Sequence, residues 1–320
     1  MTLNPSAREV RFVSIPEGLH QERVDAALSR LLGLSRSTVV TLIENGEITR
    51  SGKALTKSDR VNTDDYLEIT MPAAATEPVL TATPIEDFKV VYDDSDVIVI
   101  DKPAGVAAHP SPGWRGPTVI GGVIAAGYQV STSGAAERQG VVHRLDVGTT
   151  GLMVIAKNEN SYSNLKQQFR DRTVTKVYHA LVQGHMDPTE GTIDAPIDRH
   201  PREDYRFAVV ADGKPSITHY KALEFFPAVS LLEIELETGR THQIRVHFSA
   251  LRHPLVGDMT YGADHTIAER LEITRPWLHA RELKFIHPAS GAEIAFFSEY
   301  PADLTRSLEI LAKGQTAQPQ

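Results

Sequence analysis

The sequence predicts an α+β protein of two domains, and three observations support this prediction. Two short runs within residues 22–45 have the apolar spacing of helices, and short β-forming segments follow them. Residues 71–84, MPAAATEPVLTATP, are rich in Pro, Ala and Thr and almost uncharged, which is typical of an extended linker. Beyond the linker, β-forming runs dominate and are interspersed with helical patterns. We therefore expect a small unit over residues 1–70 and a larger domain over residues 85–312.

Length and composition restrict the class of protein. The chain has 320 residues, of which 41% are hydrophobic and 23% charged, as in ordinary globular proteins. It contains no run of about 20 apolar residues, so we expect no membrane span. The N-terminal stretch lacks the apolar core of a signal peptide, and the absence of cysteine excludes disulfides and thiolate metal sites. These features favour a cytoplasmic protein.

The net charge limits how the protein can meet nucleic acid. The formal net charge is −8, which argues against nonspecific binding of nucleic acid across the whole surface. Any nucleic-acid-binding function therefore requires local concentration of the basic residues.

The first unit follows a polar arm, residues 1–10, and consists of two helices and short β segments. Gly33 ends the first helix, Ser35 caps the second, and Gly46 ends it. We predict these elements at Glu22–Leu32, Arg36–Asn45, 47–50 and 66–70. Residues 1–75 carry 9 Lys and Arg against 10 Asp and Glu, a weak electrostatic footprint for nucleic-acid binding. A packing module of helix-turn-helix form that binds no nucleic acid remains an alternative, as does a DNA-binding module.

The second domain is organised around residues 140–158, GVVHRLDVGTTGLMVIAKN. Val141 and Val142 favour a strand, a Gly-Thr-Thr-Gly turn follows, and the apolar run 152–156 predicts a buried strand. Asp146 therefore lies where a strand ends, in the kind of loop that often carries catalytic groups. The alternative is structural: Asp146 begins the turn, and Arg144 pairs with it.

Several elements flank this motif. Residues 88–92 and 97–100 predict a β-hairpin, which ends at Lys102-Pro103. Asn160 or Ser161 begins a helix that runs through Arg170. Lys166, Arg170, Arg172 and Lys176 form a basic cluster, which is more often a solvated helix face than a binding site. We predict strands at 175–182 and 231–237, a long excursion over 184–215, a final helix over 302–312 and a disordered tail over 313–320.

The stretch Thr238–His253 is the most basic window of the chain. It contains three arginines, three histidines and no acid. Ile244, Val246 and Phe248 alternate with polar residues, which predicts a strand with Arg245 on its other face. Because His242 and His247 then point to opposite faces, and no HExxH motif occurs, we expect no metal site.

Three motifs in order resemble those of the RluA family of pseudouridine synthases. They are His143-Arg144-Leu145-Asp146 with the following Gly-Thr-Thr-Gly-Leu, Lys176-Val177-Tyr178, and Gly239-Arg240-Thr241-His242-Gln243-Ile244-Arg245. The resemblance implies a catalytic domain with a mixed, mainly antiparallel sheet flanked by helices. It also implies that Asp146, Tyr178 and Arg245 form the active site, and that Lys102 and Pro103 support it.

The resemblance extends to the first unit and to the RNA partner. Residues 23–53 are similar to the RNA-binding module first described in ribosomal protein S four, with Arg36, Arg50 and Lys53 as candidate RNA contacts. In the second domain, the candidate RNA contacts are His143, Arg144, Arg240 and His242. By its length and N-terminal module, the chain is most similar to the large-subunit ribosomal RNA synthases of types D and C. We expect a monomer that acts on structured RNA.

The expected reaction converts uridine to pseudouridine and consumes nothing, so the resemblance implies no cofactor. Asp146 would act as nucleophile or base, Arg245 would neutralise its charge, and Tyr178 would stack on the uracil and help remove the proton from carbon five. The target uridine must leave its stack, at a cost of a few kcal/mol. Two alternatives remain: a non-catalytic RNA-binding or ribosome-assembly factor, and the same chemistry on tRNA.

Overall fold

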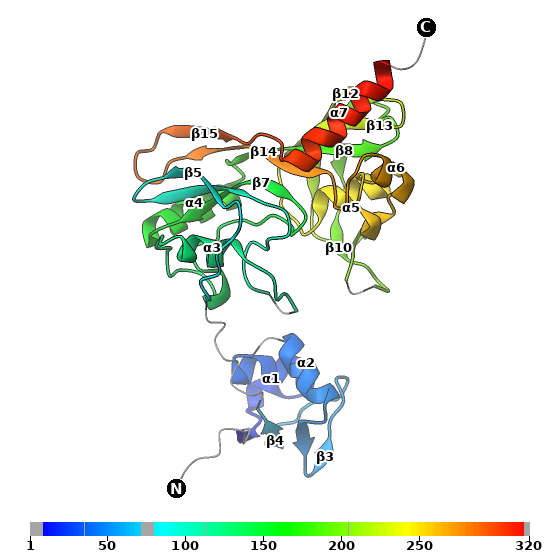
Figure 1. Ribbon diagram of the computed structural model, residues 1–320. Coiled ribbons are helices and arrows are strands. Elements are labelled where there is room, and N and C mark those ends of the chain that lie inside the picture. Colours follow the sequence, from blue (N-terminus) through cyan, green and yellow to red (C-terminus); the bar gives the residue numbers. More distant parts are fainter. Residues whose placement is uncertain (1–8, 35, 72–79, 112, 204, 317–320) are drawn as a thin grey trace. The chain divides into compact units, whose positions relative to one another are not determined.

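The protein, seen in a computed structural model, divides into two compact units, Met1–Glu77 and Pro78–Gln320 (Figure 1). The structure describes residues 9–34, 36–71, 80–111, 113–203 and 205–316. Several predicted features therefore lie outside the described residues, namely most of the arm, the cap Ser35, residues 72–79 of the linker and residues 317–320 of the tail. No helix of the described part combines the length and apolarity that a membrane span needs.

The N-terminal unit is a four-stranded antiparallel sheet, ordered β1-β4-β2-β3, with two helices packed on it. Its elements are β1 (Val10–Ser14), η1 (Glu17–Leu19), α1 (Val24–Leu32), α2 (Arg36–Glu44), β2 (Ile48–Arg50), β3 (Lys53–Ala54) and β4 (Tyr66–Thr70). Alternate residues of β4, Leu67 and Ile69, are buried with Leu28 of α1 and Val39 of α2. The two predicted helices and both predicted β segments are therefore present.

Three details of this unit differ from the prediction. Strand β1 was not predicted, because its residues do not alternate strictly between apolar and polar. A strand at the edge of the sheet that is mostly exposed does not need such alternation. Helix α1 begins at Val24 rather than at Glu22, because the main chain of Glu22 accepts a hydrogen bond from Val61 and remains extended. Helix α2 ends at Glu44, one residue before the predicted end.

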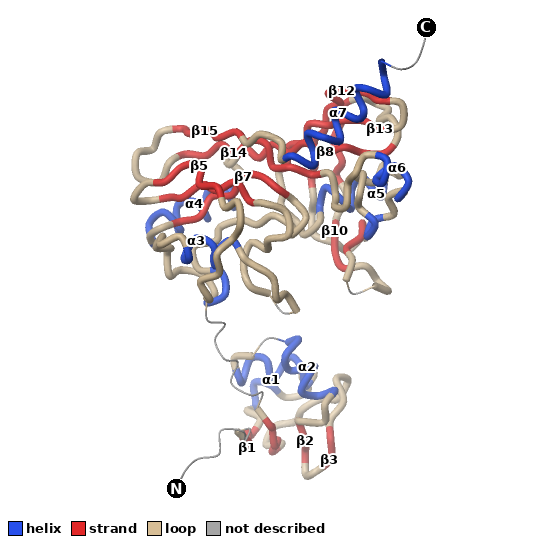
Figure 2. The backbone as a smooth tube through the Cα atoms, viewed as in Figure 1, coloured by secondary structure: helices blue, strands red, loops and turns tan. Residues whose placement is uncertain are grey.

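The second unit contains a nine-stranded sheet, whose strands are drawn in red in Figure 2. The order is β5-β6-β7-β14-β8-β13-β12-β9, with β15 paired to β14, and only β7 and β14 run parallel among these pairs. The predicted mixed, mainly antiparallel sheet is confirmed. Its strands are β5 (Lys89–Asp93), β6 (Val97–Lys102), β7 (Thr150–Ala156), β8 (Thr175–Gln183), β9 (Glu190–Asp194), β12 (Ile217–Phe226), β13 (Val229–Leu236), β14 (Leu278–Ile286) and β15 (Glu293–Phe297).

Helices cover both faces of this sheet. The helical segments are α3 (Val119–Ala125), η2 (Ala136–Arg138), α4 (Glu159–Asp171), α5 (Gln243–Ala250), η3 (Met259–Tyr261), α6 (His265–Arg270) and α7 (Ala302–Thr316). A separate two-stranded ribbon, β10 (Ile197–Arg199) with β11 (Phe207–Val209), lies within the predicted excursion. Helices α3 and α5 share one hydrophobic core with Tyr178 of β8, whereas Leu181 of β8 packs with α6 and α7. Tyr178 therefore lies on the face that α5 covers.

The predicted strand at residues 238–248 is wrong, because Gln243–Ala250 form helix α5. His242, at its N-cap, adopts a left-handed conformation with φ of 57°, which ends any extended run. The buried Gln243 side chain accepts hydrogen bonds from Thr238 and from the Arg240 N–H group. In the helix, Ile244 and Phe248 are four residues apart and share one buried face. The two-residue alternation was therefore misleading.

Three further boundaries differ from prediction. Helix α4 begins at Glu159, because the Asn158 side chain accepts a hydrogen bond from the Ser161 N–H group and caps it. No strand forms at Val141 and Val142, where a single bridge joins Val141 to Ile155. Helix α7 continues to Thr316, so the start of the predicted disordered tail is helical.

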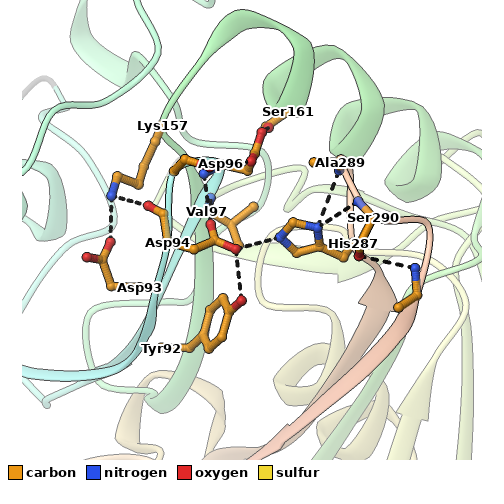
Figure 3. A network of polar contacts seen from close by, with 12 residues as sticks. Tyr92, Asp93, Asp94, Asp96, Val97, Lys157, Ser161, His287, Ala289 and Ser290 are labelled. Carbon is orange, nitrogen blue, oxygen red and sulfur yellow. Dashed lines mark hydrogen bonds and ion pairs between the residues drawn. The ribbon is translucent and has the colours of Figure 1, made fainter.

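A polar network holds the β5–β6 turn against the end of β14 (Figure 3). The Asp94 carboxylate accepts hydrogen bonds from Tyr92, from His287 and from the N–H groups of Asp96 and Val97. These hydrogen bonds lower the pKa of Asp94 to about 2, although burial alone would raise this pKa. Asp94, Asp96 and His287 place possible metal-ligand atoms within 4.8 Å of one another. Their hydrogen bonds within the protein give the group a structural role.

Candidate active site

Asp146 lies in the loop before β7, which main-chain hydrogen bonds hold in place. Its own carbonyl accepts a bond from the Thr149 N–H group, and the Gly105 N–H group donates to the carbonyl of Val147. The carboxylate is 18% exposed and lines a cavity of about 90 Å³ together with Tyr178, Arg245 and Leu278. A small cavity with one carboxylate suits a single flat base.

Lys102 supports this loop through a hydrogen bond to its main chain. Its side chain is fully buried, and its ammonium donates to the carbonyls of Pro103, Val106 and Val147 at 3.0, 2.8 and 3.3 Å. Burial lowers the pKa of Lys102 to about 7, although the negative charge of Asp146 acts to raise this pKa. The lysine thus connects the end of β6 to the residue that follows Asp146. A supporting role of Lys102 and Pro103 in the reaction remains a prediction.

Arg245 projects from α5 and joins two carboxylates. Its Nη1 lies 3.3 Å from Oδ2 of Asp146, while its Nε and Nη2 donate to Asp258 at 2.6 and 2.9 Å. Burial opposes the charge of Arg245, but the hydrogen bonds and charge of Asp258 outweigh burial and raise the pKa of the guanidinium. Asp258 is 1% exposed, so this pair is an interior one that fixes the direction of Arg245.

Tyr178 forms a wall of the same cavity. It lies on β8, is 7% exposed, and lines both the small cavity and a larger neighbouring pocket. Burial raises the pKa of its hydroxyl, and the Asp146 charge raises it further. The tyrosine is therefore neutral, and its ring is the part available for stacking.

His242 is the second side chain near the Asp146 carboxylate, and Tyr261 holds it in place. Nδ1 of His242 lies 2.8 Å from the hydroxyl of Tyr261, and Nε2 lies 3.8 Å from Oδ2 of Asp146. The Tyr261 oxygen already accepts a bond from the Phe207 N–H group, so its own proton is available to Nδ1. That assignment leaves the proton of the neutral ring on Nε2, facing Asp146. Burial lowers the pKa of His242, although the Asp146 charge opposes the change.

A larger pocket of about 500 Å³ adjoins the small cavity and is strongly basic. Arg144, Tyr178, Leu236, Gly239 and Arg240 line both spaces. Six basic side chains face the pocket against one carboxylate, Glu237; they are Arg138, Arg144, Arg170, Arg172, Lys176 and Arg240. Arg144 and Arg240 are exposed and so remain candidate RNA contacts.

His143, also predicted as an RNA contact, lies in the wall of the larger pocket. Its Nε2 accepts a hydrogen bond from the Val154 N–H group, and its ring stacks on Phe169 at 4.6 Å. Burial lowers the pKa of His143 to about 3, and the charge of Lys176 acts in the same direction. The ring is therefore neutral at ordinary pH and is part of the pocket wall.

The purely structural interpretation of Asp146 is also testable against this geometry. Among the described residues, the recorded partners of its carboxylate are Arg245 and His242, and no ion pair with Arg144 occurs. The turn uses the main-chain carbonyl of Asp146. Its side chain is therefore free to face the cavity.

The candidate RNA contacts of the N-terminal unit are described within that unit alone. Arg36 pairs with Asp25 at 3.1 Å, and Arg50 pairs with Asp65 at 2.6 Å. Lys53 is exposed on β3. Their role in RNA binding remains a prediction, and two of the three charges are already offset.

Sequence reasoning missed Asp258 and Tyr261 as members of the site. Both lie in the segment that follows α5, and contact with Arg245 and His242 gives each its role. No local pattern of the sequence indicates which side chain an aspartate such as Asp258 will bind.

Comparison with known proteins places this geometry in context. A family profile described as RNA pseudouridylate synthase matches residues 96–250. An uncharacterised RNA pseudouridine synthase of Mycobacterium tuberculosis is 54% identical over 94% of this chain and 98% of its own length. The ribosomal large subunit pseudouridine synthase D of Pseudomonas aeruginosa is 38% identical, covering 96% of this chain and 97% of that protein. The solved structure of human RNA pseudouridylate synthase domain containing 1 superposes with a TM-score of 0.56 at 27% identity, covering 74% of this chain and 98% of that one.

Proposed function

Because the chain belongs to the RluA family of RNA pseudouridine synthases, we propose that its substrate is large-subunit ribosomal RNA and that Asp146 carries the reaction. The family membership makes the protein an isomerase that converts uridine to pseudouridine in RNA. The choice of RNA rests on relatives named as large-subunit synthases, which match nearly the whole chain. The observation that carries the catalytic assignment is the contact of Asp146 with Arg245 in a small cavity walled by Tyr178.

The reaction breaks the bond between the ribose and the base nitrogen, turns the base, and joins the ribose to carbon five. Carbon five loses its proton, and the freed base nitrogen takes one up, so the composition of the nucleoside is unchanged. Asp146 is the carboxylate that faces the cavity, so we assign to it the attack or proton removal that starts the reaction. Arg245 holds the carboxylate and offsets its charge, while Asp258 fixes Arg245 from behind. Because burial raises the pKa of the Tyr178 hydroxyl, we assign to this residue the stacking of the uracil rather than the removal of a proton.

The cavity has room for one base, so the target uridine must leave its stack to enter it. Unstacking costs a few kcal/mol, which contacts elsewhere on the RNA must offset. Arg144 and Arg240 lie at the junction of the two cavities and are placed to contribute such contacts. This arrangement supports an RNA substrate with an exposed or mismatched uridine.

The experiment that tests the proposal is a map of pseudouridines in ribosomal RNA and tRNA from a strain lacking this gene. We expect specific pseudouridines of the large-subunit RNA to disappear, to return with the wild-type gene, and to stay absent with the Asp146→Asn variant. Loss confined to tRNA would assign the same chemistry to that substrate. An unchanged map with defective ribosome assembly would favour the non-catalytic alternative.

A further inference from the structure

Lys176 is a buried lysine without a hydrogen-bond acceptor in the part of the chain that the structure describes. It lies on β8, two residues before Tyr178, and is 9% exposed. No hydrogen bond or ion pair of its ammonium with a described residue is recorded, and the Phe169 ring lies 6.0 Å away. A ring contact leaves the three N–H donors of an ammonium without an acceptor. Burial lowers the pKa of Lys176, and the charge of Glu235 on the neighbouring strand β13 offsets this only in part.

The ammonium of Lys176 opens onto the large basic pocket. Arg170 and Arg172, at the end of α4, line the same pocket. Its one carboxylate, Glu237, already has partners in Arg172 at 3.3 Å and His219 at 2.8 Å. The pocket therefore carries a surplus of positive charge that no described side chain neutralises, and an anion bound there would supply what Lys176 lacks.

The position of the pocket indicates which anion it would hold. It shares Arg144, Tyr178 and Arg240 with the cavity that contains Asp146. An RNA strand whose uridine fills the small cavity must therefore continue past the mouth of the large pocket. The anionic group nearest to an inserted base on such a strand is a backbone phosphate.

We propose that this pocket is a phosphate subsite, in which Lys176, with Arg170 and Arg172 at its rim, binds a backbone phosphate beside the target uridine. This inference rests on the proposed function, because it takes the bound strand to be the substrate. The three residues of the basic cluster that line the pocket, Arg170, Arg172 and Lys176, then have a binding role, and Lys176 is the buried one. The subsite holds the strand in register, while Asp146 acts on the base.

The test uses the full-length protein and a stem-loop RNA that contains the uridine mapped in the deletion strain. Single phosphates around that uridine are replaced one at a time by neutral methylphosphonates, and affinity is measured by fluorescence anisotropy. We expect one position to weaken wild-type binding about tenfold, as is reasonable for one lost charge-assisted contact. With Lys176→Met, the same replacement should change affinity less than about twofold. The slope of log affinity against log salt concentration should also become shallower by roughly one released ion.

Matched variants separate the subsite from general charge and from misfolding. Lys166→Met removes an exposed lysine of α4 that does not line the pocket, and should keep the full methylphosphonate effect. Lys176→Arg should retain the effect, since it keeps a donor cation. If Lys176→Met does not fold, Lys176→Gln replaces it in the same comparison.

Three outcomes would overturn the subsite. In the first, no methylphosphonate weakens RNA binding by the wild-type protein. In the second, the Lys176→Met variant loses as much affinity as the wild type on the same replacement. In the third, the protein binds inorganic phosphate tightly, but no methylphosphonate changes its affinity for RNA. Wild-type turnover of the unmodified stem-loop is measured in parallel. An inactive wild-type protein would refute the proposed function, whereas an active one without coupling would refute only the subsite.

Discussion

Asp258 binds Arg245 through two hydrogen bonds, at 2.6 and 2.9 Å, and thereby directs the remaining guanidinium nitrogen at Asp146. The carboxylate that faces the cavity thus has its partner held by a second, buried carboxylate. A bidentate arginine–carboxylate pair restricts the plane of the guanidinium more strongly than a single contact would. The geometry of the candidate active site therefore depends on a residue that need not touch the substrate.

The first prediction follows from this relationship. Asp258→Asn should lower kcat by about 10- to 100-fold with a smaller change in KM, because Arg245 loses its fixed direction. It should also lower the free energy of unfolding by roughly 3–5 kcal/mol, the usual cost of removing one partner of a buried ion pair. Steady-state kinetics and urea unfolding measure the two effects. Asp198→Asn, in the β10–β11 ribbon, is the control. Unchanged kcat in Asp258→Asn would contradict the positioning role.

The second prediction concerns Asp146. Asp146→Asn keeps the size of the side chain but removes its charge, so turnover should fall by at least about 10³-fold, as for other essential catalytic groups. RNA affinity should change little, because the phosphate contacts lie elsewhere. Single-turnover tritium release from carbon five measures the chemistry, and anisotropy measures the binding. Activity near the wild-type level would remove Asp146 from the mechanism.

Local sequence patterns predicted much of the fold. The β5–β6 hairpin and β7 stood out as apolar runs bounded by turn residues, and β8 and β13 stood out through alternation along the strand. Such signals depend only on neighbours in the chain. Helix α5 was missed for the same reason: Ile244, Val246 and Phe248 alternate, and only the packing of the buried Gln243 side chain decides for a helix.

The site was predictable where motifs mark it and not where distant residues complete it. The family motifs gave Asp146, Tyr178 and Arg245 as candidate catalytic residues, and the structure brings all three to one cavity. By contrast, Asp258 obtains its role from contact with Arg245, and the burial of His143 depends on β7 and Phe169. Partner choice and burial are tertiary properties, which a single sequence does not display.

The third prediction concerns the Tyr261 hydroxyl. Tyr261→Phe removes the group that holds Nδ1 of His242, so the ring can take either tautomer and its Nε2 proton no longer faces Asp146 consistently. We expect kcat to fall by about 3- to 30-fold, for a loss of roughly 1–2 kcal/mol, with KM nearly unchanged. Nitrogen-15 NMR of the imidazole should show a mixed tautomer state.

Tyr220→Phe provides the matched control for that variant. Its hydroxyl donates to the Pro188 carbonyl at 3.3 Å and does not line the cavity of Asp146. This variant should keep both the wild-type kcat and the His242 spectrum. If the His242 ring keeps its wild-type tautomer in Tyr261→Phe, another contact determines which nitrogen carries the proton.

The fourth prediction is a pH dependence of stability that arises from His143. Its pKa is about 3 in the folded protein and 6.5 ordinarily, so the unfolded chain binds one more proton between these values. The free energy of unfolding must therefore fall as the pH falls below 6.5, by up to about 1.4 kcal/mol per pH unit from this residue. His143→Gln should make the fall shallower.

Tryptophan fluorescence during urea unfolding measures this effect in the second unit alone, because Trp114 and Trp277 both lie there. His265→Gln is the control, since the His265 side chain is 72% exposed on α6. An identical pH slope for wild type and His143→Gln would show that His143 does not contribute.

The fifth prediction concerns the N-terminal unit, which we propose positions RNA and takes no part in the chemistry. Deleting residues 1–77 should leave a folded fragment, because the complete nine-stranded sheet and all three candidate catalytic residues belong to Pro78–Gln320. Affinity for structured ribosomal RNA should fall, and its salt dependence should become shallower as phosphate contacts are lost. A short stem-loop should still be modified at high enzyme concentration.

The charges of this unit make the salt dependence the decisive measurement. Arg36 and Arg50 already pair with Asp25 and Asp65, so each must exchange a carboxylate for a phosphate when RNA binds. The exchange yields less affinity than a free cation would, but it still releases counterions from the RNA and steepens the salt slope. Lys53→Met in the full-length protein isolates one exposed cation and should lower the slope by roughly one ion. If the truncated enzyme binds and modifies full-length ribosomal RNA with unchanged affinity and slope, the unit is not an RNA anchor, and a protein-contact role becomes the better explanation.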